Sequence, residues 1–128
     1  MEFPQDLYFT QDHEWLRFDE DAGTCIVGIT EFAQSELGDI VYVEIDELDN
    51  DLAKDDPFGT VEAVKTVAEL FMPVSGTVQE MNESIEDSPE LLNNDPYGEG
   101  WIIKIKLSDP SEISQLLSAE DYSVVAGS

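Results

Sequence analysis

The chain is poor in residues that cross-link or ligate. Its 128 residues include one cysteine, Cys25, so no disulfide can form within it. Cys25 lies in the apolar run CIVGI, where we expect a small buried side chain. The chain also has one histidine, His13, which without a cysteine partner makes a poor metal ligand set, so no metal site is expected. We expect His13 to be a structural, partly buried imidazole.

Positive charge is scarce. Five Lys and Arg residues stand against 30 Asp and Glu residues, which gives a formal net charge of −25. Nucleic acids and anionic membranes are bound through clustered Lys and Arg side chains, so neither is expected as a partner. A protein with a basic docking surface, in contrast, would be attracted to this chain.

Long apolar runs are missing as well. The N-terminal stretch MEFPQDLYF has neither the basic region nor the apolar core of a targeting peptide. No segment approaches the ~20 apolar residues that are needed to span a bilayer. We therefore expect the chain to work in the cytoplasm of a bacterium or archaeon, or in the mitochondrial matrix if it is a processed form.

What is present favours one β-rich domain. The apolar content is 41%, and we expect a single domain over 1–128 with its core from about 8 to 122. Short strand-like runs recur between turn signals, and the clearest is WIIKIKL at 101–107. In that run, one face of the expected strand carries Trp101, Ile103, Ile105 and Leu107.

Helical signals are few. Short helices are expected near 30–37, 89–93 and 110–122. The expected N-cap residues of the first two are Thr30 and Ser88, and the third segment begins with Asp109 and Pro110. Many short strands with a few short helices predict a mainly antiparallel β sandwich or barrel.

One lysine stands out in the acidic middle of the chain. Over residues 55–103, Lys65 is the only basic side chain among eleven carboxylates. It lies in EAVKTVAE (62–69), whose two halves mirror one another. Folded as a hairpin about its centre, this segment would pair Val64 with Val67 and would place Lys65 at the exposed tip. Its content of Ala, Glu and Lys favours a helix instead.

Several longer motifs carry a family resemblance. In order and spacing, the chain resembles the H-protein of the glycine cleavage system from about Tyr8 to Tyr122, in the segments HEWLR, VGITEFAQSELGDIVYVE, VEAVK, PVSGTV, DSPELLNNDPYGEGWIIKIK and LLSAEDY. The resemblance implies a flattened β-sandwich of the lipoyl- and biotinyl-carrier type, a barrel-sandwich hybrid. It also implies a hairpin around the lysine, which overrides the local helical preference.

The resemblance implies a cofactor and a function. The family carries lipoate in amide linkage on the lysine of an E-S-V-K motif, which corresponds to Lys65, with Ala63 in place of the serine. The chain would be a carrier rather than an enzyme. It would take an aminomethyl group from the PLP-dependent glycine decarboxylase (P-protein) to the tetrahydrofolate-dependent aminomethyltransferase (T-protein). Its other partners would be dihydrolipoyl dehydrogenase (L-protein) and a lipoate-attaching enzyme.

The resemblance also implies a cleft for the loaded arm. Two acids of this chain correspond to positions lining the family's aminomethyl-lipoyl cleft, Glu14 in HEW and Glu69 after the lysine. A carboxylate there could pair with the amine of the carried group. The alternative is that both are ordinary exposed carboxylates.

Three other functions compete with the shuttle. H-like proteins can donate lipoyl groups to other enzymes in a lipoate relay, and the sequence does not separate this role from the first. A biotinyl carrier shares the fold, but biotin sites flank the lysine with methionines, whereas Lys65 lies between Val64 and Thr66. The third alternative function is that of an unmodified binding module, in which the lysine carries no group.

Overall fold

The computed structural model of the chain describes residues 3–126. The strands are β1 (Tyr8–Phe9), β2 (Glu14–Asp19), β3 (Thr24–Ile29), β4 (Ile40–Ile45), β5 (Asp51–Leu52), β6 (Pro57–Ala63), β7 (Val67–Phe71), β8 (Gly76–Met81) and β9 (Ile103–Leu107). The helices are α1 (Glu31–Leu37), α2 (Ser84–Asp87), α3 (Leu91–Asn94), the 3₁₀ helix η1 (Pro110–Gln115) and α4 (Ala119–Val125). Among residues 3–126, no helix is long and apolar enough to cross a bilayer.

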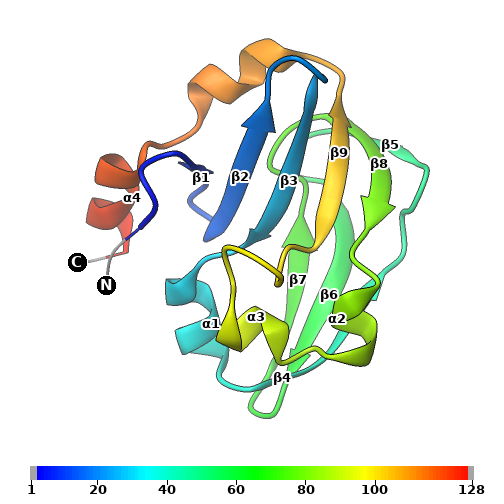
Figure 1. The fold of residues 1–128 in the computed structure, drawn as a ribbon, viewed down its shortest axis with the longest axis vertical. Coiled ribbons are helices and arrows are strands. Elements are labelled where there is room, and N and C mark those ends of the chain that lie inside the picture. The colour runs from blue at the N-terminus through cyan, green and yellow to red at the C-terminus, as the bar shows by residue number, and fades with distance from the viewer. Residues whose placement is uncertain (1–2, 127–128) are drawn as a thin grey trace.

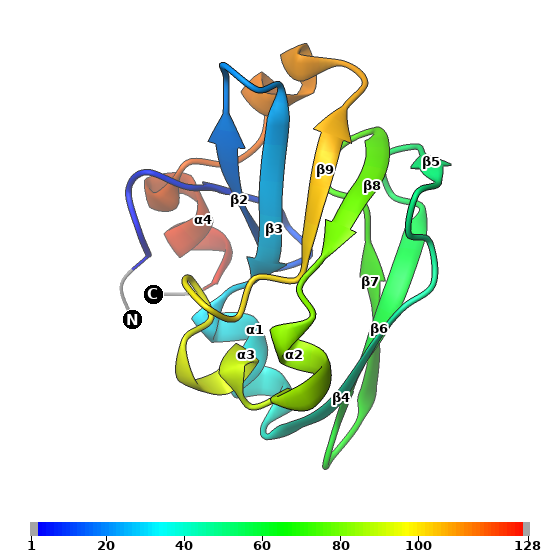
Figure 2. The same cartoon turned by 45° about the vertical axis from the view of Figure 1, so that its right-hand side comes forward.

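Two antiparallel sheets form the two layers of a sandwich (Figure 1). The larger sheet has the strand order β1-β2-β3-β9-β8-β5, and the smaller has the order β4-β6-β7. Figure 1 shows the smaller sheet behind the larger one, and Figure 2 shows it to the right of and below the larger one, with α1, α2 and α3 gathered toward the lower end. The expected mainly β sandwich is confirmed.

The core lies on both faces of β2. Leu16 packs into the main cluster between the sheets, together with residues such as Phe58 and Ile105. Trp15 points the other way, into a second cluster that includes Phe9 and Tyr122. α4 and the N-terminal segment cover this second cluster, so successive residues of β2 are buried instead of alternating between core and solvent.

The last apolar run departs from its expected pattern at one residue. Ile103, Ile105 and Leu107 are buried on one face of β9, as expected. Trp101 precedes the strand and packs on the second cluster instead. The side chain of Asn82 donates to the Trp101 carbonyl at 2.7 Å.

The helix expected near 30–37 is confirmed as α1. The Thr30 hydroxyl accepts from the backbone N–H of Ala33 at 3.1 Å and caps the N-terminus. Gly38 ends the helix with a φ of 84°, a backbone conformation that favours glycine.

The helix expected near 89–93 is present but begins later. α3 starts at Leu91, and Glu90 precedes it without a side-chain cap. Ser88, the expected cap, instead closes α2, because its N–H donates to the Ser84 carbonyl at 2.9 Å. α2 itself was not expected.

The helix expected near 110–122 is present but is divided into two elements, η1 and α4. Asp109 caps η1 by accepting from the backbone N–H of Ser111 at 3.1 Å. Leu117 then exchanges two backbone hydrogen bonds of 2.8 Å with Phe9, and this strand-like pairing interrupts the helix. α4 begins afresh with Ser118 as its N-cap.

Candidate functional site

Strands β6 and β7 form the hairpin that presents Lys65. Glu62 pairs with Val67, and the backbone N–H of Ala63 donates to the Thr66 carbonyl at 2.8 Å. Lys65 lies in the turn between them, and the turn that joins β6 to β7 forms the lower extremity of the molecule in Figure 2. The local preference for a helix is therefore overridden by pairing within a three-stranded sheet.

The register expected from the mirrored sequence is wrong. Val67 pairs with Glu62 and not with Val64. The backbone N–H of Val64 donates outside the hairpin, to the carbonyl of Asp39 at 3.0 Å. The turn is thus fixed by its contact with the start of β4, which the symmetry of the side chains could not indicate.

Lys65 is exposed, and its amine is available for modification. Within residues 3–126 it makes no hydrogen bond or ion pair. Three of the other four cations are engaged, since Arg17 donates to the Tyr97 carbonyl at 2.9 Å, Lys106 donates to the Ala22 carbonyl at 2.8 Å, and Lys104 lies 3.5 Å from Glu80. An accessible primary amine of this kind can enter the active site of a modifying enzyme.

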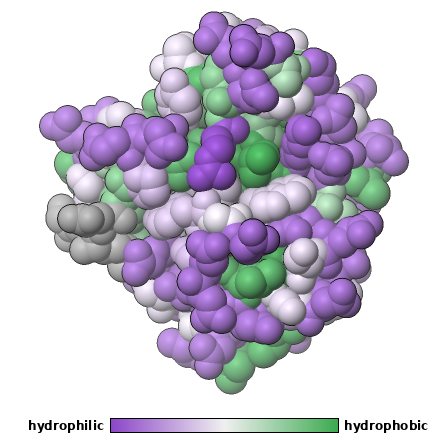
Figure 3. Space-filling view, in the orientation of Figure 1, coloured by the Kyte–Doolittle hydropathy of each residue, from purple (hydrophilic) through white to green (hydrophobic). Residues whose placement is uncertain are grey.

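Apolar side chains surround the lysine. We call the four of them the hairpin collar: Val41, Tyr42, Val64 and Val67, which are 50%, 49%, 73% and 61% exposed. Glu62 lies between Tyr42 and Val67 in one row across the sheet, because it pairs with both. In Figure 3, hydrophobic atoms appear at the lower end of a largely hydrophilic face, where Figure 1 places the hairpin. Exposed apolar side chains that cluster in this way mark protein-docking surfaces.

Glu14 is buried, with 2% of its surface exposed. Its Oε1 lies 3.4 Å from the Thr10 hydroxyl, whereas Oε2 has no hydrogen-bond partner among residues 3–126. Burial raises the pKa of this carboxyl well above its ordinary value of 4.5, and the charge of Asp12 raises the pKa further. The alternative of an ordinary exposed carboxylate is therefore wrong for Glu14.

A tight turn and a hydrogen-bond relay hold Glu14 in place. The Thr10 N–H donates to the Glu14 carbonyl at 3.0 Å, and His13 between them has a φ of 66°. His13 Nδ1 lies 2.8 Å from the Tyr122 hydroxyl, which lies 2.8 Å from the Thr30 hydroxyl. His13 is partly buried, so its expected structural role is confirmed. The sequence carried no signal that Tyr122 would be its partner.

Glu69 is exposed on β7, as the alternative reading expected. β7 is an edge strand of the smaller sheet. The backbone N–H of Phe71, two residues beyond Glu69, faces the Glu14 carboxyl. From the turn that holds Lys65, β7 therefore leads past Glu69 to the carboxyl of Glu14, which belongs to β2. Within the described part of the chain, no hydrogen bond or ion pair joins the three side chains.

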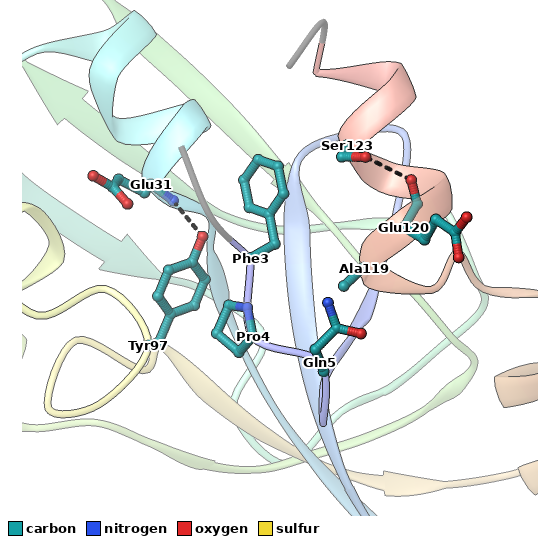
Figure 4. Close-up of a pocket in the computed structure, with 8 residues that line it drawn as sticks. All are labelled: Phe3, Pro4, Gln5, Glu31, Tyr97, Ala119, Glu120 and Ser123. Atoms are coloured by element: carbon teal, nitrogen blue, oxygen red, sulfur yellow. Dashed lines mark hydrogen bonds between the residues drawn. The ribbon is translucent and has the colours of Figure 1, made fainter.

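One cavity lies beside these elements, and a second lies apart from them. One of about 360 Å³ is lined by Thr10, Asp12 and Asp55 among others, and so adjoins Glu14. The other, of about 1060 Å³, lies between the N-terminal segment, the start of α1 and α4 (Figure 4). There the Tyr97 hydroxyl accepts from the backbone N–H of Glu31 at 3.0 Å. This cavity is at the opposite end of α1 from the lysine, and none of the expected site residues lines it.

Known proteins resemble the chain over nearly its whole length. Residues 7–127 match the family described as glycine cleavage H-protein. The glycine cleavage system H protein of Salinibacter ruber is 57% identical over 125 residues, which are 98% of this chain and 99% of that protein. That of Chlorobium limicola is 52% identical, with 99% of each chain covered.

A solved structure agrees with the fold. The crystal structure of a glycine cleavage system H protein from Mycobacterium marinum matches with a TM-score of 0.89 and 34% sequence identity, covering 98% of this chain and 100% of that one. The sandwich, the exposed hairpin lysine and the full-length sequence match all agree, and the chain belongs to the glycine cleavage H-protein family.

Proposed function

We propose that Lys65 is the attachment site of a lipoyl group, and that the chain shuttles an aminomethyl group from glycine decarboxylase to aminomethyltransferase. The observation that carries this proposal is the uncommitted amine at the tip of the hairpin, in a chain that matches the H-protein family from end to end. The whole chain would act as one carrier domain without a catalytic group of its own. The bacterial relatives favour the cytoplasm as its compartment.

The residues around the turn suit an amide-linked group. The deprotonated amine of Lys65 would form the amide, and no ion pair has to be broken first within the described residues. Ala63, which replaces the serine of the family motif, is 6% exposed and packs in the main core, where a hydroxyl would need a partner. When bound, the lipoyl group supplies a disulfide that takes up the aminomethyl group on one sulfur.

Glu14 is the proposed acceptor for the amine of the carried group. Its Oε2 is buried without a partner among residues 3–126, and an ammonium group would supply the missing donors. Glu14 lies near Phe71, which is roughly 14 Å along β7 from Val67 at the turn end of the strand. To reach Glu14, the arm would therefore have to fold back along β7. Glu69 lies on this route and is proposed as a second, exposed contact.

The partners would dock on the hairpin collar. They are the decarboxylase, the aminomethyltransferase, dihydrolipoyl dehydrogenase and the lipoate-attaching enzyme. The collar offers apolar contact, and the acids around it, such as Glu62 and Glu69, would attract a basic rim on each enzyme.

Salt is therefore expected to weaken turnover with the decarboxylase. Raising the ionic strength from 0.15 to 1 M shortens the Debye length from about 8 to about 3 Å. We expect the KM of the decarboxylase for this chain to rise severalfold over that range. Free lipoamide, which lacks the acidic carrier, serves as the control substrate. An equal salt response for both substrates would contradict attraction by the acidic surface.

The intact mass of the protein from its own cells tests the modification. The proposal predicts the increment of one lipoyl group, located on Lys65 by peptide mapping. A biotinyl increment or an unmodified mass in cells that degrade glycine would overturn it.

Disruption of the gene separates the shuttle from the relay. The shuttle predicts loss of glycine cleavage with normal lipoylation of the 2-oxo acid dehydrogenases. Loss of lipoylation on those enzymes would show a relay role.

A further inference from the structure

Asn93 in α3 binds the junction between α1 and β4. Its Oδ1 accepts from the backbone N–H of Ile40 at 2.8 Å. Its Nδ2 donates to the Gly38 carbonyl at 2.9 Å and to Gln34 Oε1 at 2.8 Å. Because the backbone partners are one obligate donor and one obligate acceptor, the orientation of the amide is determined. Figures 1 and 2 both show α3 beside α1 at the lower end of the molecule.

The segment that Asn93 holds supports the lysine turn. Asp39 lies between the two backbone groups that Asn93 binds, and its carbonyl accepts from the Val64 N–H at 3.0 Å. The stem of Lys65 lies over Gly38, where a Cβ atom would come within 2.9 Å of the Lys65 Cε. Residues 38–40 are thus a platform on which the turn rests.

The turn needs this external support. Tight two-residue hairpin turns favour types I′ and II′, whose positive φ angles match the twist of the paired strands, and they therefore prefer Asn-Gly or another glycine-containing pair. Here the turn holds Val64 and Lys65, and neither has a positive φ, so the turn is not one of these favoured types and matches the strand twist less well. Its geometry is therefore secured from outside, through the bond from Val64 to Asp39.

We infer that Asn93 is a positioning residue for Lys65, holding the platform that presents the amine to the lipoate-attaching enzyme. This inference rests on the proposed modification of Lys65. It assigns to Asn93 a role in recognition by that enzyme, since a loose turn would have to be ordered at every encounter.

Replacing Asn93 by alanine tests the inference. The Asn93→Ala variant is expected to raise the KM of the attaching enzyme for the unmodified protein about tenfold, with a smaller change in kcat. Hydrogen exchange at the Val64 amide is expected to become faster. Asn93→Asp keeps the acceptor for Ile40 but sets a carboxylate oxygen against the Gly38 carbonyl, so it should also raise the KM and speed exchange at the Val64 amide.

The chain offers a matched control. Asn82 also makes three hydrogen bonds, donating to the carbonyls of Glu99 and Trp101 at 2.7 Å and accepting from the Ser84 N–H at 3.1 Å. Asn82→Ala should lower the melting temperature while leaving the KM and the Val64 exchange rate at their wild-type values.

The outcomes separate the inference from the proposed function. If Asn93→Ala and Asn82→Ala change the KM equally, or if neither Asn93 variant alters it, the positioning role is refuted. If the wild-type protein is not lipoylated at Lys65, the proposed function fails, and the Val64 exchange rate still reports whether Asn93 secures the turn.

Discussion

Replacing Lys65 by arginine is expected to abolish lipoylation and carrier activity while leaving the fold unchanged. A guanidinium stays protonated and cannot form the amide. Because Lys65 is exposed and makes no ion pair within residues 3–126, the change in the free energy of unfolding should stay within about 0.5 kcal/mol. Intact mass after incubation with the attaching enzyme, a glycine-cleavage assay and thermal unfolding measure the three quantities.

Lys54 provides the control for Lys65. It is also exposed, and no ion pair engages it within the described residues, but it precedes β6 instead of lying in the turn. Lys54→Arg should be lipoylated and active like the wild type. A lipoyl increment on the Lys65→Arg protein would show that another amine is used and would refute the assignment.

Replacing Glu14 by glutamine is expected to stabilise the unloaded protein at neutral pH and to impair its retention of the aminomethyl group. The buried carboxyl keeps one oxygen without a partner, and Asp12 and Asp55 add like charge. Leaving such a group buried costs about 1–3 kcal/mol, which the neutral amide would partly avoid. Glu14 is therefore not the ordinary exposed carboxylate of the alternative expectation, and its replacement should change the stability.

The pH dependence of the unfolding free energy tests whether ionisation of Glu14 is the cause of the stabilisation. The pKa of Glu14 is raised in the folded state, so the folded protein binds more protons than the unfolded chain above about pH 4.5, and its stability falls as pH rises. Glu14→Gln removes this contribution. The difference in unfolding free energy between variant and wild type should be near zero at pH 4 and grow toward pH 8. A difference independent of pH would contradict ionisation as the cause.

Although Glu14→Gln is expected to be more stable, it is expected to release the carried aminomethyl group faster than the wild type. A charge-assisted hydrogen bond contributes about 1.5–3 kcal/mol, so its loss should speed release of the carried group by at least about tenfold. Mass spectrometry of enzymatically loaded protein over time measures this release. Glu69→Gln is the comparison, and its exposed side chain should have a smaller effect. Equal lifetimes for wild type and Glu14→Gln would exclude Glu14 as the acceptor.

Much of the local structure could be predicted from neighbouring residues. The cap at Thr30 and the alternation in β9 follow from short-range rules, and the structure confirms both. The motifs around Lys65 likewise pointed to the family that the comparisons confirm. These features need only contacts within a few residues, or a pattern of residues along the chain.

Other features depend on contacts between distant segments. The break between η1 and α4 follows from the pairing of Leu117 with Phe9, more than a hundred residues earlier. The burial of Glu14 depends on its packing against β7 at Phe71. No local pattern encodes such contacts, because they exist only once the layers have come together.

The sequence by itself therefore determined the β-rich architecture, the acidic composition and the family resemblance, and it singled out Lys65 as the candidate for modification. Only the tertiary structure decided how that lysine is presented. The local preference for a helix gave way to sheet pairing, and the turn register is secured by Asp39 and, through Gly38 and Ile40, by Asn93. The physical reason is that a short hairpin has little stability of its own, so strands and helices remote in sequence must supply the hydrogen bonds that hold it.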